Sequence, residues 1–317
     1  MGGFLSELGK RLAEQWMSLL VLPGALYLAF CAVAHTLGHA HALDVGRLTE
    51  RITSWADAPA VGTVGGQVVL LAAVLAAAAM TGLVAQAAGS VIERLYLAAG
   101  WRAWPPGLRQ LARWRTARRR SRWERAASAW HRQRKATGLA HAAGEPVDPA
   151  PLRAAHAAMT RIAAEAPDRP TWSGDRVHAA AVRMDRDHHL DFAAVWPHLW
   201  LILPDGTRSE ITAARQALAR AGTLGAWALL YLALTPWWWP AAVVGAGTAL
   251  TSWRRTRAAA DTFGLLLEAV TRLYARDLAG QLGAHVVGPL TRPAGDSLSR
   301  LVTPSPPPRP RGAQDPG

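Results

Sequence analysis

The distribution of apolar residues constrains this chain more than any other feature. Half of its 317 residues are apolar, and they gather in long runs separated by arginine-rich stretches. In the stretch 207–257, two apolar segments flank Pro-Trp-Trp-Trp-Pro at 236–240, and Arg254, Arg255 and Arg257 follow the second. Tryptophan favours the interface between membrane and water, and arginine favours the cytoplasmic flank of a span. The stretch therefore predicts a membrane hairpin that turns over at three tryptophans.

Extending this reading to the whole chain predicts an all-α membrane protein. It has four transmembrane helices in two hairpins and a helical, Arg-rich cytoplasmic region, since the basic residues near the spans then fall on one side. We expect it in the cytoplasmic membrane, with both termini cytoplasmic. The predicted parts are an interfacial amphipathic helix at 1–16, spans at 17–37 and 64–89 around an outer loop at 38–63, a cytoplasmic region at 90–218, spans at 219–236 and 239–253, a cytoplasmic helix and extension at 254–302, and a disordered Pro-rich tail at 303–317.

One apolar segment, 192–204, does not fit a span. A helix that crosses the membrane needs about 20 residues, and Pro197 and Pro204 interrupt this shorter run. The sequence predicts that it lies in the membrane interface or dips in and returns. None of the four predicted spans contains a buried Asp, Glu, Lys or Arg, since Arg220 lies at the basic end of the third span. This argues against a channel or transporter, because ion pathways usually need such groups.

The net charge of +13 comes almost entirely from arginine. It is densest in a predicted helix at 107–135, where tryptophans alternate with the arginines, a composition typical of contact with anionic headgroups. We expect anionic phospholipid as a partner and no nucleic acid, because no recognisable nucleic-acid module is present. The predicted lipid-contact residues are Arg113, Arg115, Arg118, Arg119, Arg120, Arg122, Trp114, Trp123 and Trp130, and the predicted membrane anchors are Trp237, Trp238 and Trp239.

Two histidines and a carboxylate after the first predicted span are weak candidates for a metal site. His39, His41 and Asp44 are ligand types that zinc accepts. Two residues of separation place His39 and His41 on different faces of a helix, so joint ligation would require irregular backbone. Histidines are also common at membrane interfaces. The lone Cys31 excludes an intramolecular disulfide and a cysteine-based metal site.

The best candidate for chemistry is the polar stretch 183–191. It holds three carboxylates and two histidines, which could act as an acid–base pair or bind a divalent metal. Arg183 and Arg186 are placed to neutralise the carboxylates, and a polar turn at the membrane surface is the competing reading. The candidate catalytic residues are Asp185, Asp187, His188, His189 and Asp191. Farther along, Glu268 and Arg272 have the spacing of a helical ion pair.

These observations favour an integral membrane protein that is not an enzyme. We expect a scaffold or interaction protein that contacts anionic lipid through its basic segment and binds a protein partner on the cytoplasmic side. The sequence predicts no cofactor and leaves the oligomeric state open. The alternative function is a metal-dependent membrane enzyme that uses the 185–191 cluster, and a small channel or transporter ranks third.

Four stretches carry a resemblance to a family of uncharacterised multi-pass membrane proteins of Streptomyces-like actinomycetes. They are Trp16–Tyr27, Leu37–Asp44, Trp196–Asp205 and Trp238–Pro240. The resemblance implies a multi-pass membrane location and no particular activity. The family pattern has a Leu-Asp like Leu190-Asp191 and no His pair, so it gives no support to His188 and His189 as site residues.

Overall fold

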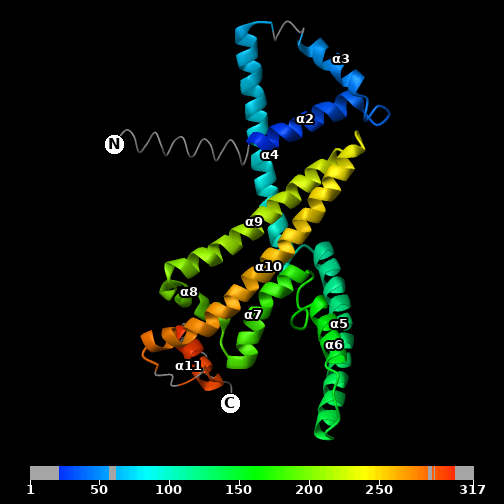
Figure 1. Cartoon of the computed structure of the whole chain (residues 1–317). Helices are drawn as coiled ribbons and strands as arrows, with labels where there is room; N and C mark the ends of the chain where they lie inside the picture. The colour runs from blue at the N-terminus through cyan, green and yellow to red at the C-terminus, as the bar shows by residue number, and fades with distance from the viewer. Residues whose placement is uncertain (1–20, 57–61, 285–287, 289, 304–317) are drawn as a thin grey trace, which may run out of the picture. The chain divides into compact units, whose positions relative to one another are not determined.

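The computed structural model describes residues 21–56, 62–284, 288 and 290–303. Within those ranges the protein is all-helical, as predicted, with ten α-helices, one short 3-10 helix and no strand (Figure 1). The predicted interfacial helix at 1–16, the first residues of the first span and nearly all of the tail lie outside the described residues. The helices are α2 Leu22–Leu37, α3 Val45–Ala56, α4 Val64–Leu97, η2 Trp101–Ala103, α5 Pro106–Ala142, α6 Ala150–Ile162, α7 Trp172–His188, α8 Phe192–Ile202, α9 Asp205–Ala233, α10 Pro240–Gln281 and α11 Arg292–Val302.

Helix boundaries follow local capping chemistry. Thr171 accepts a hydrogen bond from the Gly174 amide and starts α7, and Asp191 accepts from two amides at the start of α8. Such caps satisfy amides that have no partner within the helix. His189 ends α7 in the left-handed conformation, with φ of 52°. The polar stretch predicted as a turn is therefore mostly the last turns of a helix.

Chain contacts divide the protein into two compact units. Unit 1 comprises 1–96 and 216–257, and unit 2 comprises 97–215 and 258–317. In unit 1, helices approach closely where side chains are small. A Cβ added to Gly24 of α2 would collide with the Ala78 carbonyl of α4, and one added to Gly222 would lie 2.7 Å from the Gly89 carbonyl. Small residues of this kind let helix backbones touch.

The buried stripe of α4 shows the same chemistry along its length. It consists of Ala78, Gly82, Ala85, Gly89 and Glu93. Its large apolar side chains point outward instead, and only 17% of its most apolar window is buried. Among the described residues, α4 is the one helix long and apolar enough to cross a membrane by length and composition. It continues past the predicted end at residue 89 and thereby includes the buried Glu93, which the predicted span did not contain.

A helix also occupies part of the predicted outer loop. Gly38, with φ of 61°, ends α2, and the chain turns before α3 begins at Val45. The turn is held by Trp238, whose indole nitrogen donates to the Ala42 carbonyl at 2.9 Å. Ala34, Leu37, Ala42, Trp238 and Ala241 form a buried cluster there.

Unit 2 has a conventional apolar core. Val195 and Leu199 of α8 are fully buried among residues of α7, α10 and α11, including Met184, Leu278 and Leu298. Trp196 and Trp200 pack against a second cluster made by Leu203, Ile211 and Val270. The segment predicted to lie in the membrane interface is thus a helix whose apolar side chains are largely covered by protein. Pro197 lies inside this helix and does not interrupt it.

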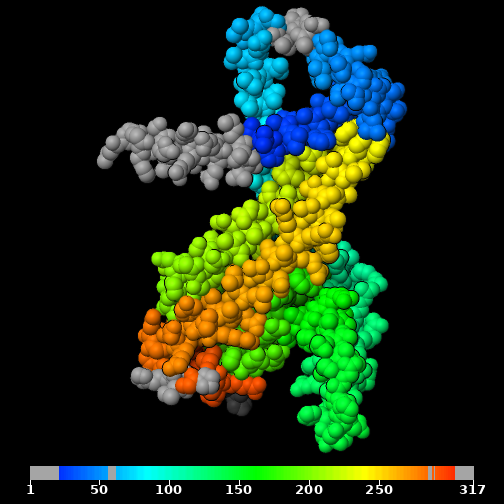
Figure 2. Space-filling model, viewed as in Figure 1, coloured from blue at the N-terminus to red at the C-terminus, as the bar shows by residue number. Residues whose placement is uncertain are grey.

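Helices α5 and α6 form an antiparallel pair within unit 2. The Trp123 indole nitrogen donates to the Ala163 carbonyl at 3.0 Å, and the ring of Trp130 lies 5.9 Å from that of His156. From the first contact to the second, residue numbers rise along α5 and fall along α6, so the two helices are antiparallel. Together they form the green column in Figure 2. Both tryptophans, predicted to contact lipid, are therefore partly buried in this pair.

Candidate functional site

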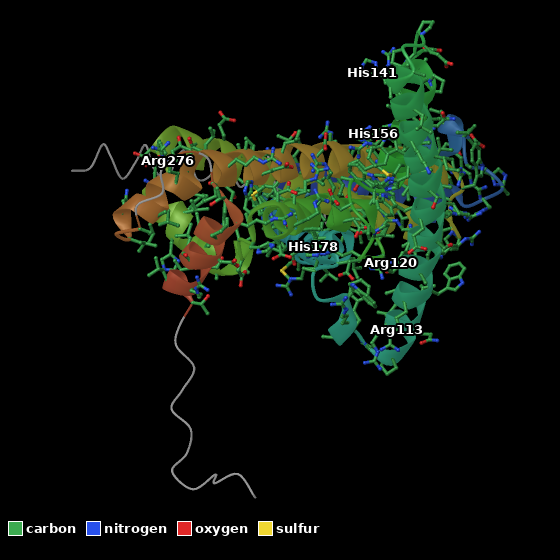
Figure 3. All side chains as sticks on the ribbon, turned by 90° about the horizontal axis from the view of Figure 1, so that it is seen from below. Arg113, Arg120, His141, His156, His178 and Arg276 are labelled. Carbon is green, nitrogen blue, oxygen red and sulfur yellow. The ribbon has the colours of Figure 1, made fainter. Side chains whose placement is uncertain are left out.

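The arginines of α5 divide between two faces of the helix, and the inner face binds the segment 162–171. Arginine is suited to this because its guanidinium holds five donors in a rigid fork. Figure 3 labels Arg113 and Arg120 on this helix. The inner contacts are Arg115 Nε to the Pro170 carbonyl at 2.9 Å, Arg119 Nη2 to the Ile162 carbonyl at 3.0 Å, Arg119 Nη1 to the Arg169 carbonyl at 2.7 Å, and Arg120 Nε to the Pro167 carbonyl at 3.0 Å. Half of the predicted lipid-contact arginines thus hold protein backbone.

Asp175 is the buried centre of this arrangement. Its side chain is 4% exposed, and it forms an ion pair with Arg119. It also accepts the amides of Asp168 at 3.0 Å and Arg169 at 2.8 Å. Burial raises the pKa of the Asp175 carboxyl, while Arg119 and the two amides act in the opposite direction. Sequence reasoning missed Asp175. An acidic residue in the first turn after a Thr cap was the available signal.

Arg169 and His178 complete the surroundings of Asp175. The Arg169 guanidinium donates to the Leu97 carbonyl at 3.0 Å. Burial lowers the pKa of His178, and the nearby positive charge of Arg169 lowers it further. Trp101 donates to the Asp168 carbonyl at 3.0 Å, so another tryptophan of the basic segment also holds this loop.

The outer face of α5 has a different character. Leu111, Trp114, Arg118 and Arg122, at helical spacing, form a stripe that we call the α5 outer stripe. Leu111 and Trp114 are each 58% exposed, and the Arg118 guanidinium lies 5.4 Å from the Trp114 ring centroid. Among the described residues, Arg118 and Arg122 have no ion-pair or hydrogen-bond partner. Apolar and cationic side chains on one exposed helix face are typical of contact with lipid headgroups.

The candidate catalytic residues are dispersed among structural roles. Asp191 caps α8, His188 Nδ1 lies 2.9 Å from the Leu290 carbonyl, and His189 Nδ1 lies 3.4 Å from Asp296. Asp185 is exposed. Within the described ranges no three His, Cys, Asp or Glu side chains gather as a metal site would require. These five residues lie in one region, but their side chains do not converge on a common point.

Asp187 instead belongs to a closed cycle of six alternating charges, which we call the six-charge ring. It connects the loop after α6, helix α7 and helix α10, and it includes the Glu268–Arg272 pair that the sequence predicted. Arg186 lowers the pKa of Asp187 through a hydrogen bond. The ring runs Glu165–Arg183 at 2.8 Å, Arg183–Glu268 at 3.0 Å, Glu268–Arg272 at 2.8 Å, Arg272–Asp187 at 4.0 Å, Asp187–Arg186 at 3.0 Å and Arg186–Glu165 at 2.7 Å.

The candidate metal ligands at 39–44 also have local partners. His41 Nδ1 lies 2.8 Å from Arg47 Nη1, and Asp44 Oδ1 accepts the Arg47 amide at 3.0 Å. Asp44 therefore caps α3, and His39 is exposed without joining them. The structure gives this segment the role of positioning α3.

The three predicted anchor tryptophans do not share one environment. Trp238 is 8% exposed and bonded to backbone, whereas Trp237 is 61% and Trp239 45% exposed. Successive tryptophan side chains in the turn at 236–240 point to opposite sides, so the indole of Trp238 points into unit 1. Trp237 and Trp239 are the two whose rings are exposed.

Comparisons with known protein families, with curated proteins and with solved structures find no match to this chain. The resemblance to a family of actinomycete membrane proteins stays a prediction.

Proposed function

We propose that the chain is a four-span protein of the cytoplasmic membrane in which unit 1 is the membrane part and unit 2 the cytoplasmic part. One observation carries this proposal. Contacts divide the chain at 96/97, 215/216 and 257/258, and hydropathy and charge predict membrane boundaries at 89/90, 218/219 and 253/254. Packing and hydropathy are different properties, and their divisions lie about seven, three and four residues apart at the three places.

The surface of unit 1 supports the same proposal. Val68, Val69 and Leu71 of α4 are each at least 60% exposed. Soluble monomers rarely expose contiguous apolar patches of this kind. Lipid tails solvate such side chains without cost, while the small residues on the opposite face of α4 pack against α2 and α9.

Cysteine accessibility tests the topology. In a Cys31→Ala background, single cysteines replace Glu50, Arg118 and Trp237, all exposed positions. A membrane-impermeant maleimide added to intact cells is expected to label positions 50 and 237, and position 118 only after permeabilisation. Labelling of position 118 in intact cells contradicts the proposal.

For its role, the arrangement supports a non-enzymatic scaffold that contacts anionic phospholipid through the α5 outer stripe. The stripe combines unpartnered arginines with an exposed indole, and each arginine near an anionic surface contributes about 1 kcal/mol. We rank the enzyme alternative below the scaffold, because Asp191 caps a helix, Asp187 and His189 contact charged side chains and His188 contacts the Leu290 carbonyl.

Lipid retention tests the scaffold's lipid contact. Protein is reconstituted in nanodiscs of phosphatidylcholine and phosphatidylglycerol, and bound lipid is counted by native mass spectrometry. The double variant Arg118→Gln and Arg122→Gln is expected to lose phosphatidylglycerol enrichment. The control double variant Arg132→Gln and Arg134→Gln has the same charge change farther along α5. Equal losses in both would show that net charge alone, and not the stripe, retains the lipid.

The scaffold role also requires a protein partner on unit 2. Crosslinking in native membranes followed by affinity purification is expected to recover one in stoichiometric amount. Recovery of none after crosslinking contradicts the scaffold role and leaves the topology untouched.

A further inference from the structure

Helices α2 and α3 of unit 1 enclose a half-open cleft of about 400 Å³. It belongs neither to the α5 outer stripe nor to the ion pairs of unit 2. The cleft is lined by His35, Thr36, Arg47, Glu50, Arg51 and Ser54.

The sequence of α3 explains why the cleft is polar. Arg47, Glu50, Arg51 and Ser54 are spaced i, i+3, i+4 and i+7, so they share one face of the helix. Other faces of α3 carry Leu48, packed against the cluster around Trp238, and the exposed Val45, Ile52 and Trp55. The Asp44 cap and the bond from Trp238 to Ala42 fix the turn before α3. The polar face therefore stays beside the last turn of α2.

The donors that face the cleft are mainly guanidinium groups. Arg47 is oriented by its 2.8 Å contact with His41, which uses one of its five donors. Among the residues that the structure describes, Arg51 has no hydrogen-bond or ion-pair partner for its guanidinium. The hydroxyls of Thr36 and Ser54 already donate to the carbonyls of Val33 and Arg51. Their oxygens remain as acceptors.

Charge and volume select the ligand class. Two arginines against the single carboxylate of Glu50 leave the cleft positive, so an anion is favoured over a cation. Two guanidinium forks offer more donors than one carboxylate can accept, whereas a phosphate presents oxygens to both. The acceptor oxygens of Thr36 and Ser54 suit a ligand whose phosphate carries a hydroxylated group.

We propose that the cleft between α2 and α3 binds a phosphate group, which Arg47 and Arg51 hold between them. The phosphate belongs either to a phospholipid headgroup or to a soluble phosphate monoester. Arg51 supplies the principal contact because its guanidinium has no partner within the described part of the chain, and Glu50 limits the affinity by repulsion.

The soluble source is tested with full-length protein in phosphatidylcholine nanodiscs, titrated with glycerol 1-phosphate by isothermal calorimetry. Arg51→Gln is expected to weaken binding roughly ten-fold, as for loss of a charge-assisted hydrogen bond. Glu50→Gln is expected to tighten it by a few-fold. A misfolded variant would not bind more tightly, so this opposite sign separates a binding site from a folding defect. Arg161→Gln is the matched control, an exposed arginine of α6 in unit 2.

The lipid source is tested by native mass spectrometry in nanodiscs that contain phosphatidylglycerol. Here Arg51→Gln is introduced into the double variant of the α5 outer stripe, so that lipid retained by the stripe cannot hide the effect of Arg51→Gln. Loss of one further retained lipid supports a headgroup, and saturable binding of glycerol 1-phosphate supports a soluble ligand. The proposal is overturned if wild-type protein shows neither the further retained lipid nor saturable binding of glycerol 1-phosphate. It is also overturned if Arg47→Gln and Arg51→Gln both behave like wild type. The topology is measured separately by cysteine labelling, so the two proposals fail independently.

Discussion

Unit 1 and unit 2 join their helices by different contacts. In unit 1, α4 meets α2 and α9 at alanine and glycine and exposes valine and leucine. Unit 2 buries large apolar side chains such as Met184 and Leu199 and joins its helices with arginine contacts. The difference fits the proposal that unit 1 lies in lipid and unit 2 in water, because lipid removes the drive to bury large apolar groups while water rewards it. Substitutions should therefore act by clash in unit 1 and by lost charge pairing in unit 2.

The largest loss of unfolding free energy is expected when Arg119 in unit 2 is replaced. Arg119→Met leaves Asp175 buried without its counter-charge and removes donors from two carbonyls, which should cost about 3 kcal/mol of unfolding free energy. Arg118→Met, its exposed neighbour, should cost less than about 0.5 kcal/mol. Urea unfolding of the detergent-solubilised chain measures both, and proteolysis at 163–171 gives a local readout.

A double variant sharpens this test. Replacing Asp175 by Leu together with Arg119→Met removes both charges, and such replacements are often close to neutral. We expect recovery of much of the lost stability. A double variant as unstable as Arg119→Met alone would show that the bonds of Arg119 and Asp175 to the backbone, and not their ion pair, hold the loop.

Unit 1 should be most sensitive at Gly24. Gly24→Ala places a Cβ against the Ala78 carbonyl, and overpacking of this kind costs about 1–3 kcal/mol. Gly65→Ala serves as the control, because nothing lies within 4 Å of the added atom and alanine is the better helix former. Thermal unfolding in nanodiscs compares them. Similar melting temperatures for the two variants would contradict the close contact of α2 with α4.

Trp238 should show a smaller effect. Trp238→Phe keeps the ring in its cluster and leaves the buried Ala42 carbonyl without a donor, at a cost of about 1 kcal/mol. Trp237→Phe, with its exposed ring, should be neutral within about 0.5 kcal/mol. The same thermal assay applies. An equal cost at both positions would mean that the tryptophans act as anchors in lipid and that the Ala42 bond contributes little.

Sequence reasoning reached the all-helical fold because hydrophobic clustering and proline and threonine signals are local. It also found the Glu268–Arg272 pair, which one helix turn determines. It missed the double role of the α5 arginines, because whether Arg119 faces lipid or loop depends on where residues 162–175 fold back. It placed 192–204 in the membrane interface for a related reason. A short apolar run looks the same whether lipid or protein covers it.

The smallest effect concerns pH and His178 in unit 2. Burial and Arg169 lower the pKa of His178 below its ordinary 6.5, so the unfolded chain binds a proton more readily than the folded one. Stability should therefore fall as pH drops below 6.5 and through the folded-state pKa. His178→Gln should remove this part of the slope, while the control variant His156→Gln on α6 should keep it. Unfolding free energies measured across this range decide the matter. A dependence of stability on pH that His178→Gln leaves unchanged would mean that other groups control the acid response of unit 2.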